Sequence, residues 1–161
     1  MRRASSLLIL ALLALAGCGS SKTSTTTSTG PSPMAIFKAA FAADKAKLTK
    51  LGEDVGAAVE GAKSQSDNAL MNQFQSLGSR ATVLAGALSQ LEAPAQYKGE
   101  LATLQSSVTQ VAGSLHAIEA AAAANDAAAA KAAAEALVAN AQEVKTSDNA
   151  LSAKLGLPTS P

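Results

Sequence analysis

Cysteine, histidine and aromatic residues are scarce in this chain of 161 residues. It contains one cysteine, Cys18, one histidine, His116, one tyrosine, three phenylalanines and no tryptophan. A lone cysteine excludes a disulfide within the chain, so an exported domain with this sequence must be stable by packing alone. Carboxylate metal sites in helix bundles need several glutamates with histidines one turn away, which one histidine does not supply. We therefore expect no metal, no haem and no other cofactor.

An excess of charge of one sign is also missing. The chain has 13 Lys and Arg against 12 Asp and Glu, for a net charge of +1 at pH 7, and no basic stripe interrupts their mixture. Proteins that bind nucleic acid concentrate basic residues on one surface, so we expect no nucleic-acid partner. The sequence contains no Gly-x-Ser-x-Gly turn, no phosphate-binding glycine loop and no histidine pair typical of a zinc site. We expect that the protein is not an enzyme.

The one long apolar run of the sequence stands at its N-terminus. Arg2 and Arg3 precede residues 7–16, which are all Leu, Ile or Ala. About ten residues is the usual length of the apolar part of a signal peptide, whereas a membrane-spanning helix needs roughly twenty. The run ends in Leu15-Ala16-Gly17-Cys18, which resembles the lipobox of bacterial lipoproteins.

This resemblance implies that residues 1–17 are a cleaved signal peptide and that Cys18 begins the mature protein. In lipoproteins the cysteine thiol carries a diacylglyceryl group, and in many bacteria the new amino group carries a further acyl chain. One acyl chain binds a membrane only marginally, and two or more anchor a protein stably. The resemblance places the protein on the extracytoplasmic face of a cell membrane, inner or outer. The alternative is an ordinary secretory signal with a chance cysteine after it.

The segment 18–32 is rich in Ser and Thr and has no side chain able to build a core. We expect a disordered tether, because such a composition cannot bury enough apolar surface to fold. A flexible coil of this length spans about 20 Å on average, which keeps a domain close to the lipid headgroups.

From residue 33 onward, apolar residues recur at spacings of three and four, the period of an amphipathic helix. Sequence signals for helix ends divide this region into four segments: Ser32 with Pro33, the turn 64–68, Pro94, Asn125 with Asp126, and Gly156 followed by Pro158. Similar helix lengths and short turns predict an all-α, up-down-up-down four-helix bundle over 33–157, with a short tail at 158–161. The whole layout resembles small alanine-rich helical lipoproteins of GC-rich bacteria, a resemblance that implies no activity.

Two carboxylates fall on the predicted apolar stripes, Asp44 in the first helix and Asp148 in the fourth. In an antiparallel first–fourth pair they lie at about the same level. If both face inward, they form a polar core pair that draws in a cation or Lys145. The other interpretation places both at the solvated edge of the seam, with Lys45, Lys47 or Lys145 nearby.

Three further residues or pairs carry hypotheses. Tyr97 is predicted to bury its ring at one end of the bundle with its hydroxyl at the rim, or else to be an interaction hot spot. His116 lies one step off its stripe, at the margin of the bundle. Gly52 and Gly56 are four residues apart, a spacing that favours close packing of helices.

Three functions remain compatible with these features. The favoured one is a monomeric, tethered interaction module that binds another, unidentified protein of the cell envelope. The second is a carrier that holds an apolar ligand between its helices, although close packing would leave little volume for it. The third is a self-associating protein whose stripes pair between chains as in coiled coils.

Overall fold

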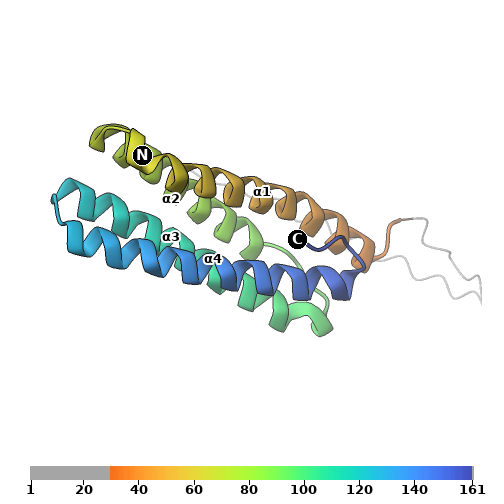
Figure 1. The fold of residues 1–161 in the computed structure, drawn as a ribbon. Helices are drawn as coiled ribbons and strands as arrows, with labels where there is room; N and C mark the ends of the chain where they lie inside the picture. Colours follow the sequence, from red (N-terminus) through yellow and green to blue (C-terminus); the bar gives the residue numbers. More distant parts are fainter. Residues whose placement is uncertain (1–29, 161) are drawn as a thin grey trace, which may run out of the picture. The chain divides into compact units, whose positions relative to one another are not determined.

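The computed structural model describes residues 30–160, and over that range it contains four α-helices and no strand. The helices are α1 (Pro33–Gly61), α2 (Asp67–Ser89), α3 (Lys98–Ala123) and α4 (Ala127–Leu155), with short 3-10 helices at Ala62–Ser64 and Ala95–Tyr97. Consecutive helices run antiparallel (Figure 1), so the predicted all-α four-helix bundle is confirmed. The predicted signal peptide, its processing residues Leu15 to Gly17, Cys18 and the tether up to residue 29 lie outside the described residues. Within 30–160, no helix is long and apolar enough to cross a membrane.

The ends of the helices follow the signals in the sequence. The Ser32 hydroxyl accepts a hydrogen bond from the backbone N–H of Ala35 at 3.2 Å, which caps α1. A carboxylate oxygen of Asp126 does the same for α4. Gly156 ends α4 with a φ of 62°, a left-handed conformation that costs glycine little. One boundary differs from the prediction: α2 begins at Asp67, inside the expected turn 64–68.

The core lies around α3, which packs against both α2 and α4. Leucine is its most frequent residue, and the largest fully buried apolar side chains are Phe41, Leu88, Leu104, Leu115, Leu137, Leu151 and Val108. Asn140 of α4 also donates a hydrogen bond to the Ser114 hydroxyl of α3 at 2.9 Å. By contrast, α1 contacts α2 over less of its length and contacts α4 least. The seam between the first and last helices is therefore the weakest of the bundle.

Aromatic side chains fix the start of α1 at one end of the bundle. The ring of Phe37 stacks on Phe41 and on Tyr97, with ring centroids 6.3 and 6.0 Å apart. Phe37 and Phe41 are buried, and Tyr97 is half-buried against the core. The Tyr97 ring packs at this end of the bundle but is only half-buried, and its role as an interaction hot spot stays a prediction.

We expect Leu104→Ala to lower the free energy of unfolding by about 3 kcal/mol, because it empties a fully buried site between packed helices. Val83→Ala is the control, since Val83 is 73% exposed and its truncation should cost less than about 0.5 kcal/mol. Urea denaturation followed by circular dichroism measures both. Equal losses for the two variants would contradict the described core.

Candidate functional site

A groove of about 540 Å³ runs between α1 and α4. Its walls are mainly apolar, and the valines at its rim, Val59 and Val138, are among the few large hydrophobic residues that are exposed in residues 30–160. The other apolar wall residues are Leu48, Val55, Leu137, Ala141 and Val144. A groove of this size lies within the range of about 300–1,000 Å³ that is common for small-molecule sites.

Two glycines of α1, Gly52 and Gly56, also line the groove. A Cβ atom added at either position would meet no atom within 4 Å. The prediction that these glycines allow close helix packing is therefore wrong. They belong to a row of residues spaced by four, from Leu48 to Glu60, and such rows form the ridges by which helices pack. With two members of the row lacking side chains, α1 has no ridge to fill the space toward α4.

The groove continues toward the core. A smaller cavity of about 80 Å³ shares Leu48, Val55 and Val144 with it and reaches Val108 and Val111 of α3. The expectation that close packing leaves little volume for a ligand is thus wrong for this seam. Other seams also contain space: a cavity of about 360 Å³ lies between α1 and α2, and one of about 430 Å³ lies beside the turn between α3 and α4.

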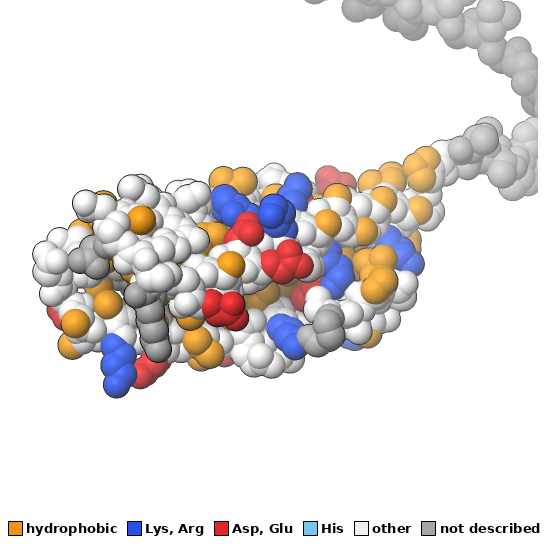
Figure 2. Space-filling view, turned by 45° about the horizontal axis from the view of Figure 1, so that its top comes forward, with side chains coloured by type: hydrophobic (Ala, Val, Ile, Leu, Met, Phe, Trp, Pro, Cys, Tyr) orange, Lys and Arg blue, Asp and Glu red, His pale blue; other side chains and the backbone are white. Residues whose placement is uncertain are grey.

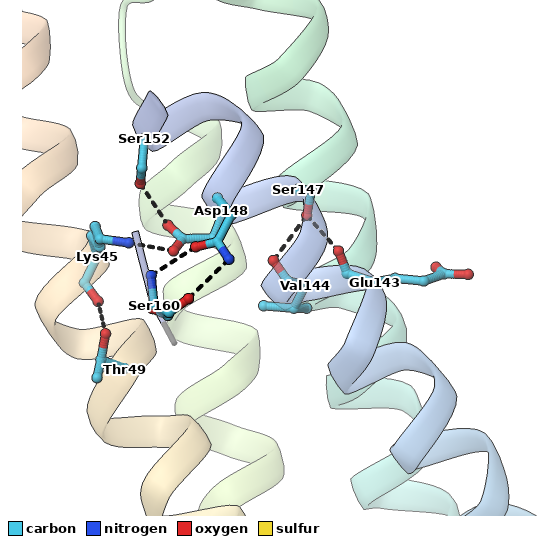
Figure 3. Close-up of polar contacts among 9 residues, drawn as sticks. Lys45, Thr49, Glu143, Val144, Ser147, Asp148, Ser152 and Ser160 are labelled. Atoms are coloured by element: carbon cyan, nitrogen blue, oxygen red, sulfur yellow. Dashed lines mark hydrogen bonds and ion pairs between the residues drawn. The ribbon is translucent and has the colours of Figure 1, made fainter. Parts of the chain in front are cut away.

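One end of the groove is polar, and a buried ion pair closes it (Figure 3). The Lys45 ammonium of α1 contacts a carboxylate oxygen of Asp148 in α4. Asp148 is 3% exposed, and its other oxygen lies 3.4 Å from the Ser152 hydroxyl, which donates to it. The pair joins α1 and α4, the neighbouring helices of the bundle with the smallest contact.

The C-terminal tail folds back over the same end. The backbone N–H of Ser160 donates to the side-chain carbonyl of Asn149 at 2.8 Å, and the Asn149 amide donates to the Ser160 carbonyl at 3.1 Å. Ser160 thereby becomes part of the groove lining, close to Lys45 and Asp148 (Figure 3). The tail is an ordered part of the site and not only an end of the chain.

The two carboxylates that the sequence singled out are both buried, Asp44 at 6% exposure and Asp148 at 3%. The interpretation that placed them in solvent is wrong, because each lies on an inward face of its helix. They do not share one cation: Asp44 accepts from the Lys47 ammonium at 2.8 Å, and Asp148 accepts from Lys45. Sequence reasoning named these lysines as neighbours without assigning them.

His116 lies at the margin of the bundle, as predicted. Its Nδ1 atom is 3.2 Å from a carboxylate oxygen of Glu119, and its ring covers Gly78 of α2. A Cβ at Gly78 would come within 2.9 Å of that ring, so this glycine makes room for the imidazole. In the part of the chain that the structure describes, no three His, Cys, Asp or Glu side chains gather into a group that suits a metal ion.

The sequence analysis missed the groove itself. The sequence did contain a signal for the groove. Gly52 and Gly56 are successive members of a row of residues spaced by four, and without their side chains the row forms no packing ridge on that face of the helix. No protein-family model, curated protein or solved structure matches this chain.

We expect Asp148→Ala to lower the free energy of unfolding by about 3 kcal/mol, since it leaves the Lys45 charge without its partner, and the Lys45 side chain is only 14% exposed. Asp44→Ala should cost less than about 1 kcal/mol, because Lys47 is 65% exposed and water can solvate it. Urea unfolding of the two variants makes the comparison. Losses that agree within error would show that the Lys45–Asp148 pair does not hold the seam.

Two carboxylates that link neighbouring helices have lowered pKa values. A hydrogen bond from Arg80 holds the pKa of Asp54 below its ordinary value of 3.8, and one from Lys154 lowers the pKa of Glu100. Because the folded state binds these protons less readily than the unfolded state, the stabilisation is present above the ordinary pKa values and is lost as the pH falls through the lowered ones.

The double variant Asp54→Asn, Glu100→Gln should therefore show a shallower fall in Tm below about pH 4 than the unchanged chain. Both carboxylates are solvent-accessible, so we expect a small effect that high salt reduces. Thermal melts from pH 6 to pH 2 measure the slope of Tm against pH. Parallel curves for the two proteins would contradict a role for these pairs.

Proposed function

We propose that this chain is a lipoprotein, anchored through Cys18 to the extracytoplasmic face of a cell membrane, with a non-catalytic binding module as its helical domain. The Leu15–Cys18 motif and the Ser/Thr-rich segment after it support the anchor. The groove between α1 and α4 is the observation that carries the binding role. Ser32 is fourteen positions after Cys18, so even a fully extended tether keeps the domain within about 50 Å of the bilayer.

The groove favours an apolar ligand over a protein partner on the outer surface. Within residues 30–160 the exposed large hydrophobic residues are Ile36, Val59, Val83 and Val138, and of these only Val59 and Val138 line the groove together. On the face shown in Figure 2, positive and negative side chains are interspersed with apolar ones. Isolated apolar residues on a mixed surface are ordinary and do not indicate a protein interface.

A tethered interaction module that binds an envelope protein remains the alternative proposal, with Tyr97 as its candidate contact. Self-association is less favoured. The apolar stripes of the four helices form one common core within the chain, so little of them is left to pair with a second copy.

Replacing Cys18 with Ala should abolish membrane anchoring. In a bacterium that processes lipoproteins, the unchanged chain should incorporate radiolabelled palmitate and partition into a detergent phase, because two or more acyl chains hold it in the membrane. Cys18→Ala should do neither, whereas Ser20→Ala, two residues further on, should behave like the unchanged chain. A Cys18→Ala protein that is cleaved, unacylated and equally membrane-bound would overturn the proposed anchor.

A further inference from the structure

We propose that the groove between α1 and α4 binds one unbranched acyl chain of a fatty acid, with its carboxylate at the Lys145 end. This inference deepens the binding role proposed above and does not depend on acylation of Cys18. The length, the volume, the wall chemistry and the distribution of charge in the groove each support it.

The length of the groove matches the depth that one acyl chain occupies in a bilayer leaflet. Along α1 its apolar lining extends from Leu48 to Val59, eleven residues apart. At 1.5 Å per residue this distance is about 16 Å. The hydrocarbon core of a bilayer is about 30 Å thick, so one leaflet, which is one acyl chain deep, measures roughly half of that.

The volume fits one chain and not two. A dry cavity of about 150 Å³ holds one benzene molecule, which corresponds to about 25 Å³ for each carbon atom. By this measure the groove, at about 540 Å³, accommodates roughly twenty carbon atoms. A fatty acid of ordinary length fills that space, whereas a phospholipid with two chains exceeds it.

Between its charged ends the groove is lined mainly by apolar side chains, with Thr49 and Gln142 as the polar exceptions, and so it suits a ligand without hydrogen-bonding groups along its length. Leucine, valine and alanine side chains from α1 and α4 face each other across the groove. At Gly52 and Gly56 a methylene chain can approach the backbone of α1, because no side chain occupies the space there. Each methylene group that leaves water contributes about 0.8 kcal/mol. A chain that fills the groove therefore has a sufficient driving force without specific polar contacts.

Charge at the two ends orients the ligand. Glu60 lines one end of the groove, and Lys145, next to the Lys45–Asp148 pair, lines the other. The charge of Lys45 is already balanced by Asp148, which leaves the Lys145 ammonium to attract a carboxylate. A carboxylate at the Glu60 end would instead meet a like charge.

The Lys145 end of the groove is also the end nearer to the point at which the chain joins the bundle. In the antiparallel arrangement of α1 and α4, Lys145 lies nearer to the start of α1 than Glu60 does. The tether reaches the domain at that same start, at Ser32. The bilayer to which Cys18 would anchor the chain is thus a nearby source of fatty acid released from lipid.

The test uses the mature chain from Cys18 onward with Cys18→Ser, so that the protein is soluble and carries no acyl group of its own. Fluorescence of cis-parinaric acid, an 18-carbon fatty acid, reports binding. Gly52→Leu should weaken binding by about tenfold, since its side chain displaces roughly two methylene groups of the ligand. The fold should tolerate the change, because a Cβ at Gly52 meets no neighbour and leucine favours helix more than glycine does.

Gly113→Leu is the matched control. Gly113 lies in α3, is exposed, and also offers open space to a Cβ, but it does not line the groove. Binding by this variant should equal that of the parent chain, and circular dichroism should show both leucine variants at least as stable as the parent. Failure of the parent chain to bind the probe, or equal binding by the Gly52→Leu variant, would overturn the site.

A second pair of variants tests the orientation. Lys145→Gln should weaken binding of palmitate by roughly threefold and leave binding of hexadecanol unchanged, because the alcohol has no charge to pair. Lys131→Gln, at the other end of α4, should alter neither. Equal effects of Lys145→Gln on both ligands would overturn the assigned position of the carboxylate.

The outcomes separate this inference from the proposed anchor. Acylation of Cys18 in cells together with no binding by the soluble chain would overturn the groove site alone. Binding by the soluble chain together with no acylation in cells would overturn the anchor alone. If the parent chain dimerised without fatty acid and Gly52→Leu abolished the dimer, the groove would bind a second copy of the chain. That result would overturn the proposal of a fatty-acid ligand.

Discussion

The buried ion pair between Lys45 and Asp148 determines how the bundle closes. Helix α3 packs against α2 and α4, so three of the helices are joined by broad apolar contacts. Helix α1 lacks such a contact with α4, and the ion pair joins them near one end of the seam. Removing two charges from water costs several kcal/mol for each ion unless the partners meet in good geometry, so the pair keeps α1 and α4 at a defined distance there. The groove exists because nothing comparable closes the rest of the seam.

The same arrangement suggests which part of the molecule moves. The start of α1 is held by the stacked rings of Phe37 and Tyr97 and by Lys45, whereas its second half faces α4 across open space. Elements with few buried apolar contacts open at the lowest cost in free energy. The second half of α1 also contributes Leu51, Val55 and Ala58 to the core, so any movement that widens the groove must keep these side chains buried.

Burial alone does not make the two inward carboxylates catalytic. Asp44 and Asp148 each face a lysine of α1, so each negative charge is neutralised by a structural partner. General acid–base chemistry needs a group that is free to exchange its proton with a substrate. Asp148 instead lines the polar end of the apolar groove, and Asp44 is not part of the groove lining.

The sequence by itself determined the helices, because capping residues and apolar periodicity act within a few residues of the chain. Ser32 and Asp126 cap the starts of helices through local hydrogen bonds, and Gly156 ends α4 through its backbone conformation. The all-α bundle follows from four stripes that must bury each other. Only the tertiary structure decided which lysine meets which aspartate, since Lys45 and Asp148 are far apart in sequence and a small rotation of either helix changes the partner. It also decided that Gly52 and Gly56 face a groove and not a helix. A missing side chain permits close approach and open space equally, and the packing of the neighbouring helices selects between them.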